Sequence, residues 1–189
     1  VYDITDYGAR ADGQSDCSRA IGEAIAAAAQ AGGGQIRFPP AKQPYLISDS
    51  IELDADNLHL KGTGATVYLK DGSAVGRTSP ETMLHIVKIN GTRDDPVENI
   101  SVAGLTIDAN YWGQTDGTSA WQASAKIAGV TRGIQVGHAH KVLIDNVAIK
   151  RSFVGMTFGL GSHNCEARDV KVTQFHHDGF GVTPERVDG

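Results

Sequence analysis

The chain has 189 residues, which is enough for one domain with a substantial buried core. Its 22 acidic and 17 basic residues give a net charge of −5, which argues against non-specific nucleic-acid binding. The 23 glycines follow no collagen period and indicate many tight turns between β-strands. No run of residues is long and apolar enough to predict a membrane span, so we expect neither nucleic-acid nor membrane partners.

The first predicted element is a helix over 15–31, between two glycine-rich turns. Asp16 or Ser15 is placed to cap its N-terminus, and Gly32 follows its C-terminus. Small apolar side chains recur on one face, namely Ala20, Ile21, Ala24, Ile25 and Ala28. Because this face is shallow and apolar, we expect the helix to lie as a lid over a broad apolar surface.

Short strands are predicted after the helix. Alternation of apolar and polar residues predicts strands over 35–40, 44–53, 82–89 and 99–110, and two short strands within 56–72 around Gly62–Gly64. A parallel sheet with crossover helices is an alternative, but it requires helices between the strands and none is predicted after residue 31.

A repeat then becomes visible in the segments that begin at Asn99, Lys141 and Asn164. Each has a polar residue, a short alternating strand, a corner and a second short strand. The last two copies are offset by 23 residues, and the offset of 42 between the first two is close to two such periods. Such periods are typical of stacked coils of parallel strands, whereas an antiparallel sandwich would not produce them. We therefore predict an all-β parallel β-helix as one domain over 1–189.

Stacked coils also bear on the cysteines and on the ends of the chain. They would keep Cys17 and Cys165 farther apart than the ~7 Å between Cα atoms that a disulfide allows, so both thiols are expected to be free. Residues 185–189 follow a coil directly, with no counterpart of the N-terminal helix. We expect a truncated chain, or a further chain or chain segment that covers this end.

The first third of the chain resembles the pectate-lyase-like superfamily. The residues that carry the resemblance are DYGARADGQSD at 6–16, GGQIRFPP at 33–40, YLIS at 45–48 and LKGTGATV at 60–67. The superfamily includes polygalacturonase-like hydrolases, lyases, phage tailspikes and mannuronan C5-epimerases. The resemblance implies a right-handed parallel β-helix with an N-terminal capping α-helix, a polysaccharide or oligosaccharide partner, and an extracellular, secreted protein.

The later part is most similar to the C5-epimerase branch, through LTIDAN at 105–110 and HDGF at 177–180. In that branch the Asp of an Asp-Gly-Phe run belongs to the active site, which implies this role for Asp178. The branch also has a Tyr-Gly-Phe-Asp-Pro-His-Glu run one coil earlier. This chain has VGMTFGL at 154–160 instead, without the Tyr, Asp and His.

Three groups of residues could act on a sugar polymer that lies across the coils. In the first, Asp178 could act as acid or base near neutral pH, assisted by His176 or His177. Strand alternation places His176 and Asp178 on one face and His177 on the other. The alternative is a polar corner in which Asp178 bonds turn amides.

In the second group, Lys150 or Arg151 could bind a uronate carboxylate or serve as base in β-elimination, although such residues also guard strand edges. The third group is the long loop 108–126. Its Tyr111, Trp112 and Trp121 could stack on sugar rings or instead pin the loop to the coil.

The remaining histidines and acids are less suggestive. His59 and His85 lie inside alternating strands and are expected to be structural. His138 and His140 could ligate a metal only if a third ligand converged, so no metal site is predicted there. Calcium is possible at Asp94–Asp95 or at Asp108, although paired aspartates in a turn usually only form the turn.

These observations lead to two functional hypotheses. The first is a carbohydrate-active enzyme, either a polysaccharide lyase, an epimerase or a glycoside hydrolase. Hydrolysis needs two facing carboxylates, and only Asp178 and Glu185 are near each other in the sequence. The second hypothesis is a non-catalytic carbohydrate-binding or tailspike-like assembly module.

Overall fold

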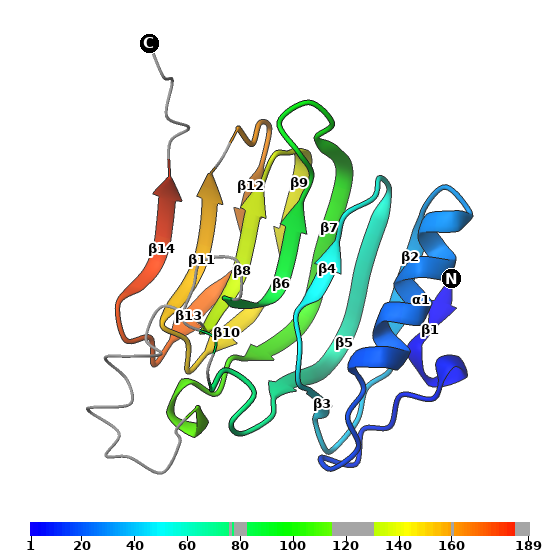
Figure 1. The fold of residues 1–189 in the computed structure, drawn as a ribbon, viewed down its shortest axis with the longest axis vertical. Coiled ribbons are helices and arrows are strands. Elements are labelled where there is room, and N and C mark those ends of the chain that lie inside the picture. The colour runs from blue at the N-terminus through cyan, green and yellow to red at the C-terminus, as the bar shows by residue number, and fades with distance from the viewer. Residues whose placement is uncertain (76, 78–82, 115–130, 160, 184–189) are drawn as a thin grey trace.

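The chain winds into a right-handed parallel β-helix closed at one end by a helix (Figure 1). It was analysed as a computed structural model, which describes residues 1–75, 77, 83–114, 131–159 and 161–183. All pairings between the described strands are parallel, as the predicted all-β parallel β-helix requires. None of the helices in these ranges is long and apolar enough to span a membrane.

The helices are η1 (Ile4–Tyr7), α1 (Ser18–Gln30) and η3 (Tyr111–Gly113). The strands are β1 (Tyr2–Asp3), β2 (Gly34–Phe38), β3 (Tyr45–Ile47), β4 (Ile51–Leu53), β5 (Leu58–Leu69), β6 (Leu84–Asn90), β7 (Val97–Asp108), β8 (Thr131–Gly137), β9 (Ala139–Asp145), β10 (Ala148–Lys150), β11 (Val154–Gly159), β12 (Glu166–Arg168), β13 (Lys171–Thr173) and β14 (Asp178–Thr183).

Two sheets run along the stack. The nine-stranded sheet has the order β1-β2-β5-β7-β10-β13, with β3 beside β5, β9 beside β7 and β12 beside β9. The five-stranded sheet has the order β4-β6-β8-β11-β14. Equivalent apolar residues of successive coils form columns inside the coil, and Ile36, Leu60, Val102 and Ile144 are fully buried in one of them.

Adjacent coils differ in length, which corrects the predicted period. Asn57 and Asn99 are 42 residues apart yet their side chains hydrogen-bond directly, and Asp145 and Arg168 are paired at an offset of 23. The interpretation of 42 residues as two periods was therefore wrong. Each longer coil has its extra residues at one corner, between β5 and β6 or between β7 and β8.

Two strand predictions also change. The segment 44–53 forms β3 and β4, which belong to different sheets because the chain turns between Ile47 and Ile51. The segment 56–72 contains one strand, β5, instead of two. A Cβ at Gly62 would lie 2.4 Å from Leu105 Cδ2, so glycine lets β5 bend closely against β7 without breaking.

The leading polar residue of the repeat has a backbone role. Asn57, Asn99, Lys141 and Asn164 all have left-handed φ angles, between 54° and 58°. Asparagine adopts this conformation more readily than most residues. In addition, Asn99 Nδ2 donates a hydrogen bond to Asn57 Oδ1 at 2.7 Å. These four residues, which we call the left-handed column, turn the chain at the same corner of each coil.

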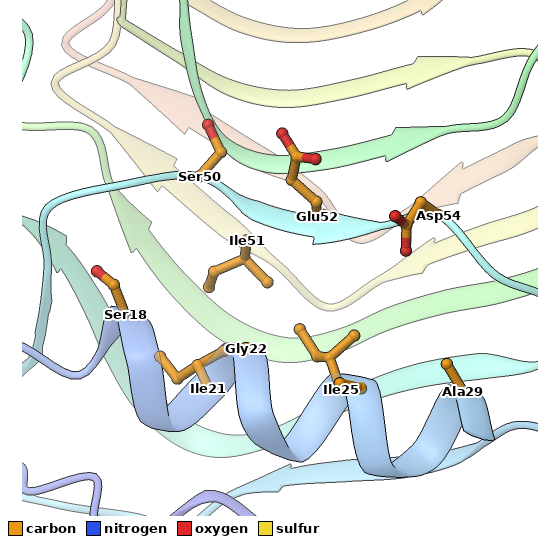
Figure 2. Close-up of a pocket in the computed structure, with 10 residues that line it drawn as sticks. Ser18, Ile21, Gly22, Ile25, Ala29, Ser50, Ile51, Glu52 and Asp54 are labelled. Carbon is orange, nitrogen blue, oxygen red and sulfur yellow. The ribbon is translucent and has the colours of Figure 1, made fainter. Parts of the chain in front are cut away.

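The predicted lid is confirmed. The helix α1 covers the end of the stack opposite β14, and the predicted face of Ala20, Ile21, Ala24, Ile25 and Ala28 is buried (Figure 1). The N-cap residue is Cys17 instead of the predicted Asp16 or Ser15, and its side chain makes no capping hydrogen bond; Asp16, one residue earlier, accepts a hydrogen bond from Ser18 N at 2.9 Å. Between α1 and β4 lies a groove of about 280 Å³, which Ile21, Ile25 and Ile51 face (Figure 2). None of the predicted site residues lines it.

Cys17 and Cys165 are free thiols, as predicted. At the far end of the stack, Phe180 and Val182 continue the columns of Met156 and Phe158. Their exposed fractions are 56% and 82%, whereas Met156 is buried.

Candidate functional site

The predicted site residues that the structure describes all lie at one corner of the coil, where strands of the nine-stranded sheet end and those of the five-stranded sheet begin. They are Tyr111, Trp112, Lys150, Arg151, His176, His177 and Asp178. We call this region the site corner. Trp121 and Glu185 lie outside the described residues. Backbone hydrogen bonds between coils fix the corner, for example from Tyr111 N to Arg151 O at 2.7 Å and from His176 N to Ser152 O at 2.9 Å.

The predicted acid–base residues, His177 and Asp178, form a hydrogen-bonded pair. His177 Nδ1 lies 2.7 Å from Asp178 Oδ2, and both side chains are more than half exposed. The prediction that alternation separates these residues was wrong, because β14 begins only at Asp178 and His177 lies in the preceding turn. A carboxylate bonded to Nδ1 orients the imidazole and leaves Nε2 available for proton transfer.

The other imidazole belongs to an aromatic group. The His176 ring lies 5.1 Å from Tyr111, 5.6 Å from Phe153 and 5.9 Å from Trp112, measured between ring centroids. The Phe153 ring also lies 5.2 Å from that of His177, so the aromatic group borders the acid–base pair. Tyr111 is buried, whereas Trp112 is 48% exposed and offers an apolar surface to a ligand.

A row of register partners crosses the five-stranded sheet beside this group. It consists of His85, Arg132, Val154 and Asp178, on β6, β8, β11 and β14. Two strand spacings separate Arg132 from Asp178, or about 10 Å. Burial lowers the pKa of the half-buried Arg132, and the charge of Asp178 acts in the opposite direction. The second effect indicates that Arg132 lies within the electrostatic reach of Asp178.

Buried polar atoms without partners gather at the same corner. His85 Nδ1, Thr131 Oγ1, Arg132 Nε and Ser152 Oγ have no hydrogen-bond partner among the described residues. Buried polar atoms are normally paired in folded proteins, so a concentration of such atoms requires a specific reason. A polar ligand bound at this corner would supply one.

Lys150 and Arg151 are engaged by a buried carboxylate. Arg151 Nε lies 2.9 Å from Asp108 Oδ1, and Arg151 Nη2 lies 2.5 Å from Asp108 Oδ2. Lys150 Nζ lies 3.4 Å from the same Oδ2. Their first role is therefore to neutralise Asp108, although Lys150 and Arg151 keep 40% and 33% of their side-chain surface exposed.

The possible calcium site at Asp108 is not supported, because both oxygens of this carboxylate already contact cationic nitrogens. Within the described ranges, no group of three His, Cys, Asp or Glu side chains is arranged to hold a metal ion.

Sequence reasoning missed Arg132, yet a signal was present. Arg132, Val154 and Asp178 are each followed by a glycine and then by Ile, Met or Phe. A Cβ on Gly133 would lie 2.3 Å from Gly155 O, and one on Gly155 would lie 2.3 Å from Gly179 O. Only glycine allows this close stacking, so the shared pattern marks equivalent positions in successive coils.

Comparison with known proteins identifies the class of protein that this fold and corner define. A family model described as rhamnogalacturonase A/epimerase, pectate lyase-like, matches residues 1–174. The chain belongs to this family, and the resemblance to the pectate-lyase-like superfamily is confirmed.

Two characterised relatives point in different functional directions. Plasmin and fibronectin-binding protein A of Streptococcus pneumoniae is 32% identical over 165 residues, which are 85% of this chain and 22% of that protein. Mannuronan C5-epimerase AlgE6 of Azotobacter vinelandii is 33% identical over 133 residues, 64% of this chain and 14% of that protein. The structure of the AlgE6 A-module matches with a TM-score of 0.70 at 27% identity, covering 95% of this chain and 45% of the module. This chain thus spans less than a quarter of either relative.

Proposed function

We propose that the site corner binds an acidic polysaccharide outside the cell and moves a proton at a uronate ring, as a lyase or an epimerase does. The observation that carries the proposal is the hydrogen-bonded pair of His177 and Asp178. Asp178 occupies the same row of register partners as Arg132. Relatives named as a mannuronan C5-epimerase and an alginate lyase support this class of substrate.

The arrangement matches the chemical demands of the step. The C5 proton of a uronate is acidified when the neighbouring carboxylate is neutralised, and the guanidinium of Arg132 would do this. His177 Nε2, with Nδ1 held by Asp178, would accept the proton. The resulting carbanion either expels the C4 oxygen, which takes a proton from solvent water as it leaves and gives elimination, or takes a proton from solvent water on the opposite face, which gives epimerisation.

The row favours proton abstraction over hydrolysis. A glycoside hydrolase of the usual kind needs two carboxyl groups about 5–10 Å apart. Asp178 is the one carboxylate in the row of His85, Arg132, Val154 and Asp178. The other members of that row are a hydrophobic residue, a guanidinium and an imidazole, so they provide no second carboxylate.

The test uses His177→Gln and Asp178→Asn on polymannuronate and polygalacturonate. Ultraviolet absorbance detects unsaturated products of elimination, and solvent deuterium incorporation at C5 detects epimerisation. We expect His177→Gln to reduce the rate at least ~100-fold, the usual contribution of a general base. Arg168→Gln is the matched control, because Arg168 pairs with Asp145 on the nine-stranded sheet and leaves the site corner intact. New reducing ends without unsaturation or exchange would overturn the proposal in favour of hydrolysis.

A second candidate is a non-catalytic binding module. Val154, which is 5% exposed, occupies the row between Arg132 and Asp178 and brings no chemical group to its centre. A relative named as a plasmin and fibronectin-binding protein supports this alternative. Oligosaccharide binding without turnover, unchanged by Asp178→Asn, would establish it.

A further inference from the structure

A second group of titratable side chains lies at a different corner, where β6, β8 and β11 end and β7, β9 and β12 follow. Here a pocket of about 320 Å³ is lined by Arg93, Pro96, His138, His140, Gly161 and His163. We call it the histidine pocket. Its volume is at the lower end of the range for small-ligand sites and corresponds to about one monosaccharide.

Two of the imidazoles are held together by the backbone of adjacent coils. The rings of His140 and His163 lie 5.1 Å apart between centroids, tilted by 54°. His163 N donates to Ala139 O at 3.0 Å, and Lys141 N donates to His163 O at 3.1 Å. These bonds form an isolated parallel bridge between His140 and His163, so the pair is a fixed feature of the stack.

A carboxylate positions one member of the pair. Glu98 Oε1 lies 3.5 Å from His140 Nδ1, and Glu98 Oε2 lies 3.0 Å from Lys141 Nζ. The hydrogen bond from Lys141 lowers the pKa of Glu98, so this carboxylate stays ionised through the weakly acidic range.

His138 is the third histidine that lines the histidine pocket. His138 has a left-handed φ of 44°, and its carbonyl accepts a hydrogen bond from Val97 N at 3.1 Å. His163 from the next coil lines the same pocket, but the described residues form no metal-binding arrangement, so the third metal ligand that His138 and His140 would need is not present among them.

The charges that line the pocket select the kind of ligand. Its titratable lining residues, Arg93 and the three histidines, are cationic or become so on protonation, and no carboxylate lines it. A guanidinium in the same wall repels a metal cation, and the described residues contain no metal-binding arrangement. We propose that the histidine pocket binds an oxyanion, the carboxylate or sulfate group of an acidic sugar, and binds it more tightly as the pH falls.

The pH dependence follows from the groups around the pair. Glu98 on β7 and Lys141 on β9 offset each other's charge, and the Arg93 guanidinium comes from the turn before β7. Glu166 begins β12 beyond His163 and is exposed. Imidazoles are therefore the groups that gain charge between neutral and weakly acidic pH. The inference does not depend on the proposed reaction, because this corner is not the site corner.

The experiment follows histidine side-chain NMR signals while sodium sulfate, galacturonate or neutral galactose is added at constant ionic strength. We expect saturable shifts of the His140 and His163 signals with at least one of the two anions at pH 5.5, at least 10-fold weaker binding at pH 7.5, and no response to galactose. The anion that saturates first identifies the source of the oxyanion. His163→Gln and His140→Gln should each weaken binding at least 10-fold.

His59→Gln is the matched control. His59 on β5 forms a hydrogen bond with Ser101 on β7 and does not line the pocket. Asp178→Asn should also leave anion binding unchanged, which separates this inference from the proposed reaction. Thermal melting checks that each variant is folded, and His138→Gln provides a second variant if His163→Gln is not. Absence of saturation at pH 5.5, equal affinity at pH 7.5, or zinc binding that displaces the anion would overturn the proposal.

Discussion

Arg151 donates two hydrogen bonds to Asp108 of the adjacent coil, from Nε to Oδ1 at 2.9 Å and from Nη2 to Oδ2 at 2.5 Å. Asp108 is 1% exposed, and the Arg151 guanidinium also lies over the Tyr68 ring, 5.4 Å from its centroid. The pair therefore joins the ends of β7 and β10 at the point where the chain turns into the site corner.

Asp108→Asn should destabilise the protein by about 3 kcal/mol, because it leaves Arg151 without its buried partner. Urea denaturation measures the change. Arg19→Gln removes an ion pair between exposed side chains of α1 and should have little effect. Equal stability of the two variants would show that the Asp108 pair does not hold the corner.

His85 should make the protein less stable in weak acid. Burial lowers its pKa to about 3, with smaller contributions from Arg132 and Lys88. Below the ordinary value of about 6.5 the unfolded chain binds a proton that the folded chain refuses, so stability falls as the pH falls. Between pH 7 and pH 5 the loss from this group is about 2 kcal/mol. His85→Leu should flatten that part of the stability profile, as measured by denaturation at each pH, and an unchanged slope would contradict the prediction.

The glycine stacking between β8, β11 and β14 gives a third prediction. A Cβ at position 155 would lie 2.3 Å from Gly179 O and 2.4 Å from Val172 Cγ1, and the backbone oxygen cannot move aside easily. Gly155→Ala should cost about 3 kcal/mol of unfolding free energy. Gly22→Ala is the matched control, since nothing lies within 4 Å of its added Cβ in α1. That change should stabilise the protein by about 0.5–1 kcal/mol, because alanine favours helix.

At the site corner, Arg132 and Trp112 should affect different kinetic steps. Arg132→Gln removes the charge that would stabilise the carbanion, so kcat should fall by about 100-fold. Trp112→Ala removes an exposed stacking surface and should chiefly raise KM, by about 10-fold. Initial rates over a range of uronate polymer concentrations separate the two effects. Equal reductions of kcat in both variants would contradict these assigned roles.

The fold was predictable because its main signals are local. The apolar face of α1 was enough to predict the lid, and the 23-residue offset between the last coils was enough to predict stacked coils. The 42-residue offset misled because a repeat period does not reveal residues inserted at a corner. The turn between Ile47 and Ile51 was missed because Ser48, Asp49 and Ser50 contain neither glycine nor proline, and their three consecutive polar side chains were the one local signal of it.

The site was predictable only in part, because its members meet across coils. The sequence indicated the His177–Asp178 segment, but alternation misplaced His177 because that rule applies only inside a strand. The partnership of Asp108 with Arg151 required the register of β7 and β10, which no single segment specifies. Arg132 could have been found by aligning the three glycines that follow the row residues.

With the left-handed column, the strands of successive coils stay aligned although the coils differ in length. One residue per coil, at Asn57, Asn99, Lys141 and Asn164, places a left-handed bend at the same position in the stack, whether 23 or 42 residues have passed since the previous one. Residues can therefore be added at the site corner while the strands beyond it keep their partners. Such a scaffold allows ligand preference to diverge by exchange of segments between β5 and β6 or between β7 and β8, with the framework inherited unchanged.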